Sequence, residues 1–160
     1  VALLINAQKV RDRLAEAVES PDIAVRRFPT AAQALAEFAD ERYDLIVIDW
    51  QVYPGVGSGC AVIDRLAATL PTTPGEVRSA YYWEVGRSVI DAVRAENSPN
   101  RATPVIVIFP ALDQSDGACN ISRDAAEADI ATRQPAEALF GASTASLKDA
   151  VARHFNTCRS

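Results

Sequence analysis

Several patterns that mark common functional classes are missing from this sequence. Its three cysteines, Cys60, Cys119 and Cys158, are odd in number and far from any Cys-x-x-Cys spacing. That usage argues against a zinc site and is typical of a reduced, cytoplasmic protein. Methionine is absent, even at the first position, so we expect the chain to be a trimmed piece of a longer protein.

The sequence also lacks a basic region and a long hydrophobic run. It contains 16 lysines and arginines against 21 aspartates and glutamates, a net charge of −5, and Arg26–Arg27 is its nearest approach to a basic cluster. Since non-specific nucleic-acid affinity comes from neutralising phosphates, we expect no nucleic-acid binding by this domain. No apolar run approaches the roughly 20 residues that cross a bilayer. The first ten residues lack the flanks of a signal peptide and predict a strand, so we expect no membrane association.

Signals of enzymatic chemistry are absent as well. The only histidine, His154, has no cysteine or serine nucleophile in its context. No residue pair suggests a hydrolase triad or a zinc site, and the glycines at 55–59 have neither the spacing nor the lysine of a P-loop. We therefore predict that the chain is not an enzyme and has no catalytic residue, cofactor or metal site.

What is present is an ordinary globular composition. The 160 residues are 49% hydrophobic and 23% charged, which fits a single domain over 1–160. A chain of this size buries about 70% of its unfolded surface and needs no disulfide or metal to hold a core.

Short apolar runs alternate with amphipathic stretches along the chain. The runs at 44–49 (DLIVID) and 104–109 (PVIVIF) are apolar on both faces, as buried parallel strands are. Strict alternation of this kind predicts a doubly wound parallel sheet covered by helices on both faces. We expect strands at 1–5, 23–28, 44–49, 104–109 and 129–132, and helices at 10–20, after Thr30, at 59–70, 84–97 and 122–128, and from 143 or 144. The functional edge would lie at the carboxyl ends of the strands, near Asn6, Asp49 and Phe109.

Four segments, taken in order, resemble the receiver domains of bacterial response regulators. They are VALLINAQKVRDRLAEAV, YDLIVIDW, RATPVIVIFP and EADIATRQP, and together they span nearly the whole chain. The resemblance implies a flavodoxin-like fold with a five-stranded parallel sheet. It also implies a helical insertion at 51–83, between the third strand and the third main helix. An alternative alignment makes 59–70 the third helix and puts the insertion after it.

The resemblance extends to only one residue of the family's phosphorylation site. Asp49 stands where such receivers carry the phosphoacceptor aspartate. Asn6 and Ala7 replace the acidic pair that holds Mg²⁺, Phe109 replaces the hydroxyl that reads the phosphoryl group, and Gln134 replaces the lysine that pairs with it. Attack of a carboxylate on an anionic phosphoryl donor needs cations that neutralise the developing charge. The pattern therefore resembles pseudo-receivers, which signal through protein contacts without Mg²⁺-dependent phosphorylation.

Two other functions stay open. Asp49 could be a genuine phosphoacceptor with non-standard metal ligands, assisted by Asp113 or Asp116. The domain could instead be a small-molecule sensor whose insertion closes over a ligand beside Trp50 and Phe109.

The insertion is rich in aromatic residues, and these predict how the domain meets partners. Trp50, Tyr53, Tyr81, Tyr82 and Trp83 lie in or beside it. Tyrosine and tryptophan dominate interface hot spots, so they predict a docking surface, with a small satellite core as the alternative.

A second candidate surface comes from the resemblance. It consists of the fourth helix, the fifth strand and the last helix, with Arg133, Gln134 and Lys148. The expected partners are other signalling proteins or domains, or a second copy of the chain.

Overall fold

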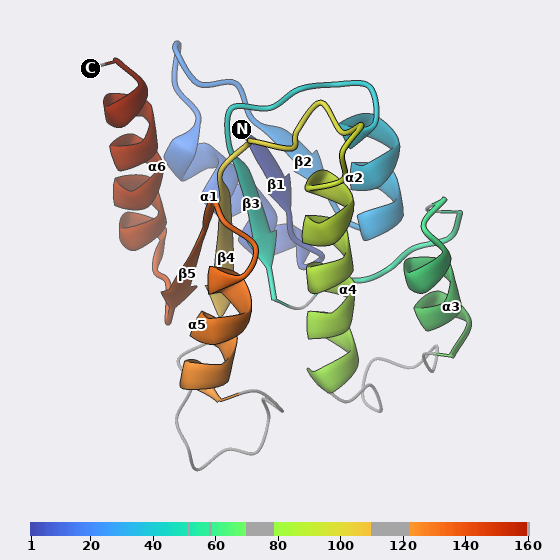
Figure 1. Ribbon diagram of the computed structural model, residues 1–160. Coiled ribbons are helices and arrows are strands. Elements are labelled where there is room, and N and C mark those ends of the chain that lie inside the picture. Colours follow the sequence, from blue (N-terminus) through green and yellow to red (C-terminus); the bar gives the residue numbers. More distant parts are fainter. Residues whose placement is uncertain (51, 58, 70–78, 110–121, 160) are drawn as a thin grey trace.

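The computed structural model describes residues 1–50, 52–57, 59–69, 79–109 and 122–159 (Figure 1). Five parallel strands form one sheet in the order β2-β1-β3-β4-β5, which confirms the predicted doubly wound, flavodoxin-like architecture. In chain order the elements are β1 (Ala2–Leu4), α1 (Gln8–Val18), β2 (Arg26–Phe28), α2 (Ala31–Phe38), β3 (Ile46–Asp49), α3 (Ala61–Thr69), α4 (Ser79–Val93), β4 (Val105–Phe109), α5 (Arg123–Ala131), β5 (Ala136–Phe140) and α6 (Thr144–Arg159).

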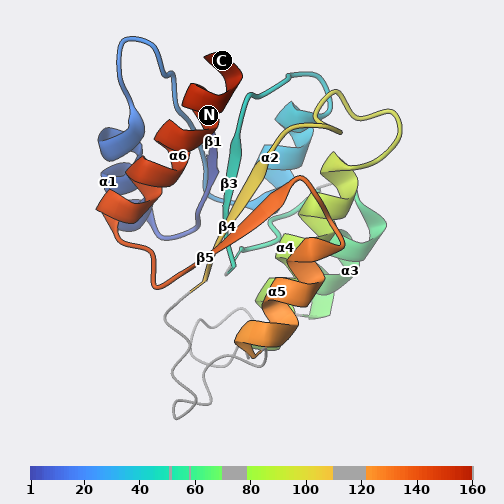
Figure 2. The same ribbon diagram turned by 60° about the vertical axis from the view of Figure 1, so that its left-hand side comes forward.

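Helices cover both faces of the sheet (Figure 2). Helices α1 and α6 pack on one face, and α2, α4 and α5 pack on the other. Alternate residues of a strand serve the two layers: Ile46 and Ile48 of β3 belong to the core beneath α2 and α4, whereas Val47 belongs to the core beneath α1 and α6. Such double burial explains why the central strands are continuous apolar runs. Among the described residues, no helix combines the length and the apolar character needed to span a bilayer.

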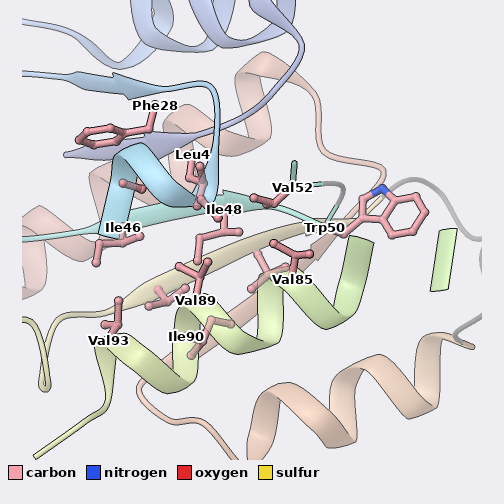
Figure 3. Close-up of a cluster of buried hydrophobic side chains, with 14 of the residues drawn as sticks. Leu4, Phe28, Ile46, Ile48, Trp50, Val52, Val85, Val89, Ile90 and Val93 are labelled. Atoms are coloured by element: carbon pink, nitrogen blue, oxygen red, sulfur yellow. The ribbon is translucent and has the colours of Figure 1, made fainter. Parts of the chain in front are cut away.

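The larger core lies between the sheet and α4. Val85, Val89 and Val93 repeat every four residues, form one stripe along α4 and face Ile46 and Ile48 in Figure 3. The stripe was predicted from its helical spacing. Full burial of each such aliphatic side chain contributes about 1.5–3 kcal/mol, so this layer is a main source of stability.

The position of the fifth strand differs from the prediction. Residues 129–132 are the end of α5 and its cap at Thr132, and β5 runs from Ala136 to Phe140. Ala126 and Ile130 lie four residues apart on the buried side of α5, so the apolar residue in DIAT continues a helical stripe. Strand β5 has a neighbour on one side only and is half-buried throughout, which makes its sequence pattern weak.

The segment after β3 turns back to cap α2. The backbone N–H groups of Ala31 and Ala32 donate to the carbonyl oxygens of Tyr53 and Pro54, each over 2.8 Å. Gly55 has a φ of +72°, and a Cβ at this position would lie 2.8 Å from Thr30 Oγ1. Only glycine fits both the backbone conformation and the close approach. Thr30 is the N-cap of α2, as predicted, and accepts a hydrogen bond from the N–H of Gln33.

Helix α3 (Ala61–Thr69) lies where the sequence predicted a helix within 51–83. Its Ile63 and Leu66 side chains are buried, and the helix packs on the outer side of α4 (Figure 1). Helix α4, which leads into β4, occupies the layer next to the sheet.

Candidate functional site

The carboxyl ends of the parallel strands meet along one edge of the sheet. Leu4 pairs with Ile48, and Asp49 pairs with Ile108 in the next strand. This register brings the ends of β1, β3 and β4 together, so Asn6, Ala7, Asp49 and Phe109 share the edge as the sequence predicted.

The end of β1 presents an amide and a guanidinium. The side-chain oxygen of Asn6 accepts a hydrogen bond from the backbone N–H of Ala7 at 3.0 Å. Arg11, in the first turns of α1, donates to the carbonyl oxygens of Ile5 at 2.6 Å and Asn6 at 3.2 Å. Arg11 was not predicted as a site residue, and its position shortly after a buried strand was the available signal. Its positive charge would oppose a divalent cation at this end of β1.

Asp49 is partly buried and ends β3 on the face that carries α1 and α6. It lines a hollow of about 270 Å³ together with residues of α1 and of the start of α6. The backbone N–H of Trp50 donates to the carbonyl oxygen of Ile108 at 3.0 Å, so β3 and β4 remain paired just beyond Asp49. The backbone that carries the Asp49 carboxylate is therefore fixed by strand pairing on both sides of the residue.

Phe109 lies on the opposite face and is a core residue with no exposed surface. Its ring stacks on Phe140 with centroids 5.1 Å apart, and the Trp83 ring lies 5.0 Å away at a tilt. The indole N–H of Trp83 donates to Asp129 at 2.7 Å, and the Arg123 guanidinium lies 4.7 Å above Phe140. An aromatic stack therefore fills the position that the sequence resemblance aligns with the receivers' hydroxyl.

Gln134 is at the wrong edge for the role that the sequence predicted. Because β5 begins at Ala136, Gln134 precedes the strand, and the neighbouring Pro135 carbonyl accepts from the N–H of Val105 at the start of β4. At the carboxyl edge, β5 ends with Phe140 and continues into Gly141 and Ala142, none of which carries a positive charge.

These residues do not fit the Mg²⁺ ion of ordinary receivers. Mg²⁺ prefers carboxylate oxygens in octahedral geometry. Asp49 is the single carboxylate at the strand ends that we describe, and the Asn6 oxygen is already an acceptor. Within the described ranges, no group of three or more His, Cys, Asp or Glu side chains could hold a metal ion. Asp113 and Asp116, the alternative acidic residues, lie outside those ranges.

The predicted aromatic docking surface is wrong in part, because its two tryptophans are buried. Trp50 and Trp83 are only 6% and 4% exposed and belong to the main core, so neither is a docking residue. Trp50 and Phe109 pack inside this core, so they do not form the wall of an open sensor pocket. Tyr53 remains 39% exposed, whereas the side chains of Tyr81 and Tyr82 lie outside the described part of the chain.

Two exposed valines in the same segment were not predicted. Val56 is 97% exposed and Val62 is 42% exposed. The signal for Val56 was its setting between glycines, where no regular element can bury it. Of the exposed large hydrophobic side chains in the ranges described, all but Val10 lie in residues 53–62.

In the second predicted surface, which contains Arg133, Gln134 and Lys148, the first two side chains make polar contacts. Arg133 pairs with Asp91 over 2.8 Å and also with Asp129. Burial lowers the pKa of Arg133, but its hydrogen bond to Asp91 and the two carboxylate charges outweigh this and raise it. The Gln134 side chain bonds the backbone of Ala136, and Lys148 is exposed on α6. All three remain candidates for a contact surface.

Comparison with protein-family models and with curated proteins finds no match. Comparison with solved structures finds the receiver domain of Francisella response regulator 1452. The two chains are 18% identical with a TM-score of 0.62, and the likeness covers 98% of this chain and 96% of the other. The chain therefore has the fold of a response-regulator receiver domain.

Proposed function

We propose that this chain is an atypical receiver domain, a pseudo-receiver that works as a regulatory protein-interaction module without Mg²⁺-dependent aspartyl phosphorylation. The observation that carries the proposal is the composition of the carboxyl edge. Asp49 is present, but Asn6, Ala7 and Phe109 stand at the positions that would bind the metal and read the phosphoryl group.

Electrostatics explains why Asp49 alone is a poor acceptor. A carboxylate that attacks an anionic donor meets charge repulsion unless cations neutralise both groups. The Nη1 of Arg11 donates to the backbone carbonyl oxygens of Ile5 and Asn6, not to Asp49. The buried ring of Phe109 offers no hydrogen bond to a new phosphoryl group.

The surface at residues 53–62 supports a protein-binding role. It presents the large apolar side chains of Tyr53, Val56 and Val62 to solvent, where a partner could cover them. Hydrogen bonds from the N-terminus of α2 hold Tyr53 and Pro54 in place, and the buried Ile63 anchors the first turn of α3. The partner would be another signalling protein that presents apolar side chains.

The first test addresses phosphorylation directly. The purified chain is titrated with Mg²⁺ and beryllofluoride, a phosphoryl mimic, while tryptophan fluorescence is recorded. Trp50 follows Asp49, and the Trp83 ring contacts Phe109, so both indoles would report a change at this edge. We expect no saturable response, against a clear one from an ordinary receiver domain run alongside. A saturable response that the Asp49→Asn variant loses would instead establish a genuine phosphoacceptor.

The second test addresses the partner surface. A photoreactive residue replaces Val62 in one variant and Ala68, exposed elsewhere on α3, in a matched control. We expect a defined crosslinked partner with the first variant and its loss when Val56→Asp is added. Equal crosslinking at both positions, unaffected by Val56→Asp, would argue against this surface.

A further inference from the structure

The hollow beside Asp49 has a lining that neither phosphorylation nor the 53–62 surface explains. It has a volume of about 270 Å³ and lies between α1 and the start of α6, on the face opposite the aromatic stack. A water molecule occupies about 30 Å³ in the liquid, so the space corresponds to roughly nine waters. That is the size of a small metabolite with a similar number of non-hydrogen atoms.

Two side chains of opposite charge line this hollow. Asp49 contributes a carboxylate, which has roughly four acceptor sites and can take a further donor. Arg13, on α1, contributes a guanidinium. Within the part of the chain that the structure describes, Arg13 makes no hydrogen bond or ion pair, unlike Arg11 two residues earlier. Both signs of charge therefore line the hollow.

The remaining wall divides into an apolar part and a hydroxyl part. Val10, Leu14 and Ile108 form the apolar part, and Val10 is 36% exposed although it is a large aliphatic residue. Ser143 and Thr144 contribute hydroxyls. The Ser143 hydroxyl also accepts the N–H of Ser146 at 3.1 Å, which caps α6 and fixes this wall.

We propose that the hollow binds a free amino acid with an aliphatic side chain. Its ammonium group would bind Asp49, its carboxylate would bind Arg13 with help from the Thr144 hydroxyl, and its side chain would cover Val10 and Leu14. A dianion would be repelled by Asp49, and a polyamine would be repelled by Arg13. A purely apolar molecule would remove both charges from water without a partner. A zwitterion with an apolar tail complements all three parts of the wall.

This inference goes beyond the proposed protein-interaction role and does not depend on it. Binding is measured on the isolated chain, without Mg²⁺ or a partner, so its failure would leave the phosphorylation and partner tests unaffected.

The test is calorimetry with L-leucine, L-isoleucine and L-valine, supported by NMR chemical-shift mapping. We expect saturable binding, with shifts confined to α1, the end of β3 and the start of α6. Two probes each lack one charge: 4-methylpentanoate has no ammonium group, and leucinamide has no carboxylate. Each lost charge-assisted hydrogen bond should weaken binding about 10- to 100-fold.

Variants of the chain locate the site. Asp49→Asn and Arg13→Gln should each weaken leucine binding by at least about tenfold, whereas Lys9→Gln, a charge change on α1 outside the hollow, should leave it unchanged. Far-UV circular dichroism checks that each variant folds, and the exposed Arg13 keeps the test valid if Asp49→Asn does not fold. Absence of binding at millimolar amino acid would overturn the proposal. Leucine binding that is unchanged in the Arg13→Gln variant would also overturn the proposal. The same holds if 4-methylpentanoate binds as tightly as leucine.

Discussion

The aromatic stack predicts that a hydroxyl cannot simply be introduced at Phe109. This ring has no exposed surface and contacts both Trp83 and Phe140. Replacing a buried phenylalanine by a small residue costs about 3–5 kcal/mol, since transfer energy and packing are both lost. Each aromatic pair accounts for about 0.5–1.5 kcal/mol of this. We expect Phe109→Thr to lower the free energy of unfolding by at least about 3 kcal/mol, a large part of the roughly 5–15 kcal/mol typical of a domain.

A matched variant separates the two sources of that loss. Phe109→Leu keeps most of the buried volume but loses both aromatic pairs, so we expect a smaller loss of about 1–3 kcal/mol. The measurement is urea unfolding followed by far-UV circular dichroism, because the Trp83 ring contacts Phe109 and its fluorescence would change with the substitution itself. If the free energy of unfolding of Phe109→Thr lies within about 1 kcal/mol of that of the parent chain, the stack is not a packed core element, and the reasoning fails.

Three further predictions concern contacts with α2 and the residues that flank it. Asn100 is fully buried, accepts the N–H of Tyr43 at 2.8 Å and donates to two backbone carbonyl oxygens, so Asn100→Ala should cost about 2–5 kcal/mol in urea unfolding; a loss below about 1 kcal/mol would contradict it. Gly55→Ala should cost more than Gly57→Ala in the same assay, because both have positive φ but only Gly55 would bring a Cβ against Thr30; equal losses would refute the contact. Burial and a hydrogen bond to a carboxylate raise the pKa of Tyr43 to about 12 from 10.0. Because the unfolded chain loses this proton first, stability should be complete below about pH 10 and fall towards about pH 12, and a Tyr43→Phe variant with the same alkaline profile would disprove the assignment.

The central strands and main helices could be predicted because their patterns are local. Residues 44–49 and 104–109 are apolar on both faces, and only a buried parallel strand has that requirement. The stripe of Val85, Val89 and Val93 follows from helical geometry alone. Since a parallel sheet gathers its strand ends at one edge, the neighbourhood of Asn6, Asp49 and Phe109 followed as well.

The fifth strand could not be predicted in the same way. An edge strand has one neighbour and is half-buried, so the sequence AEALF shows only a weak hydrophobic pattern. Ile130 was assigned to a strand because it is β-branched and apolar, but it packs as part of α5. The error moved Gln134 to the wrong edge of the sheet. The exposure of Trp50 and Trp83 was equally undecidable, because an aromatic residue in a long insertion serves a core or a surface depending on what packs against it.

By itself, then, the sequence determined the class of fold, the carboxyl edge at which Asn6, Asp49 and Phe109 meet, and the residue types present there. These follow from residue identity and from repeats of two or about four residues. Only the tertiary structure decided what surrounds Asp49. Arg13, Asp49 and Thr144 lie far apart in the chain, and the crossovers of a parallel sheet bring them to one hollow. Contacts of that kind depend on packing between layers, which no local pattern encodes.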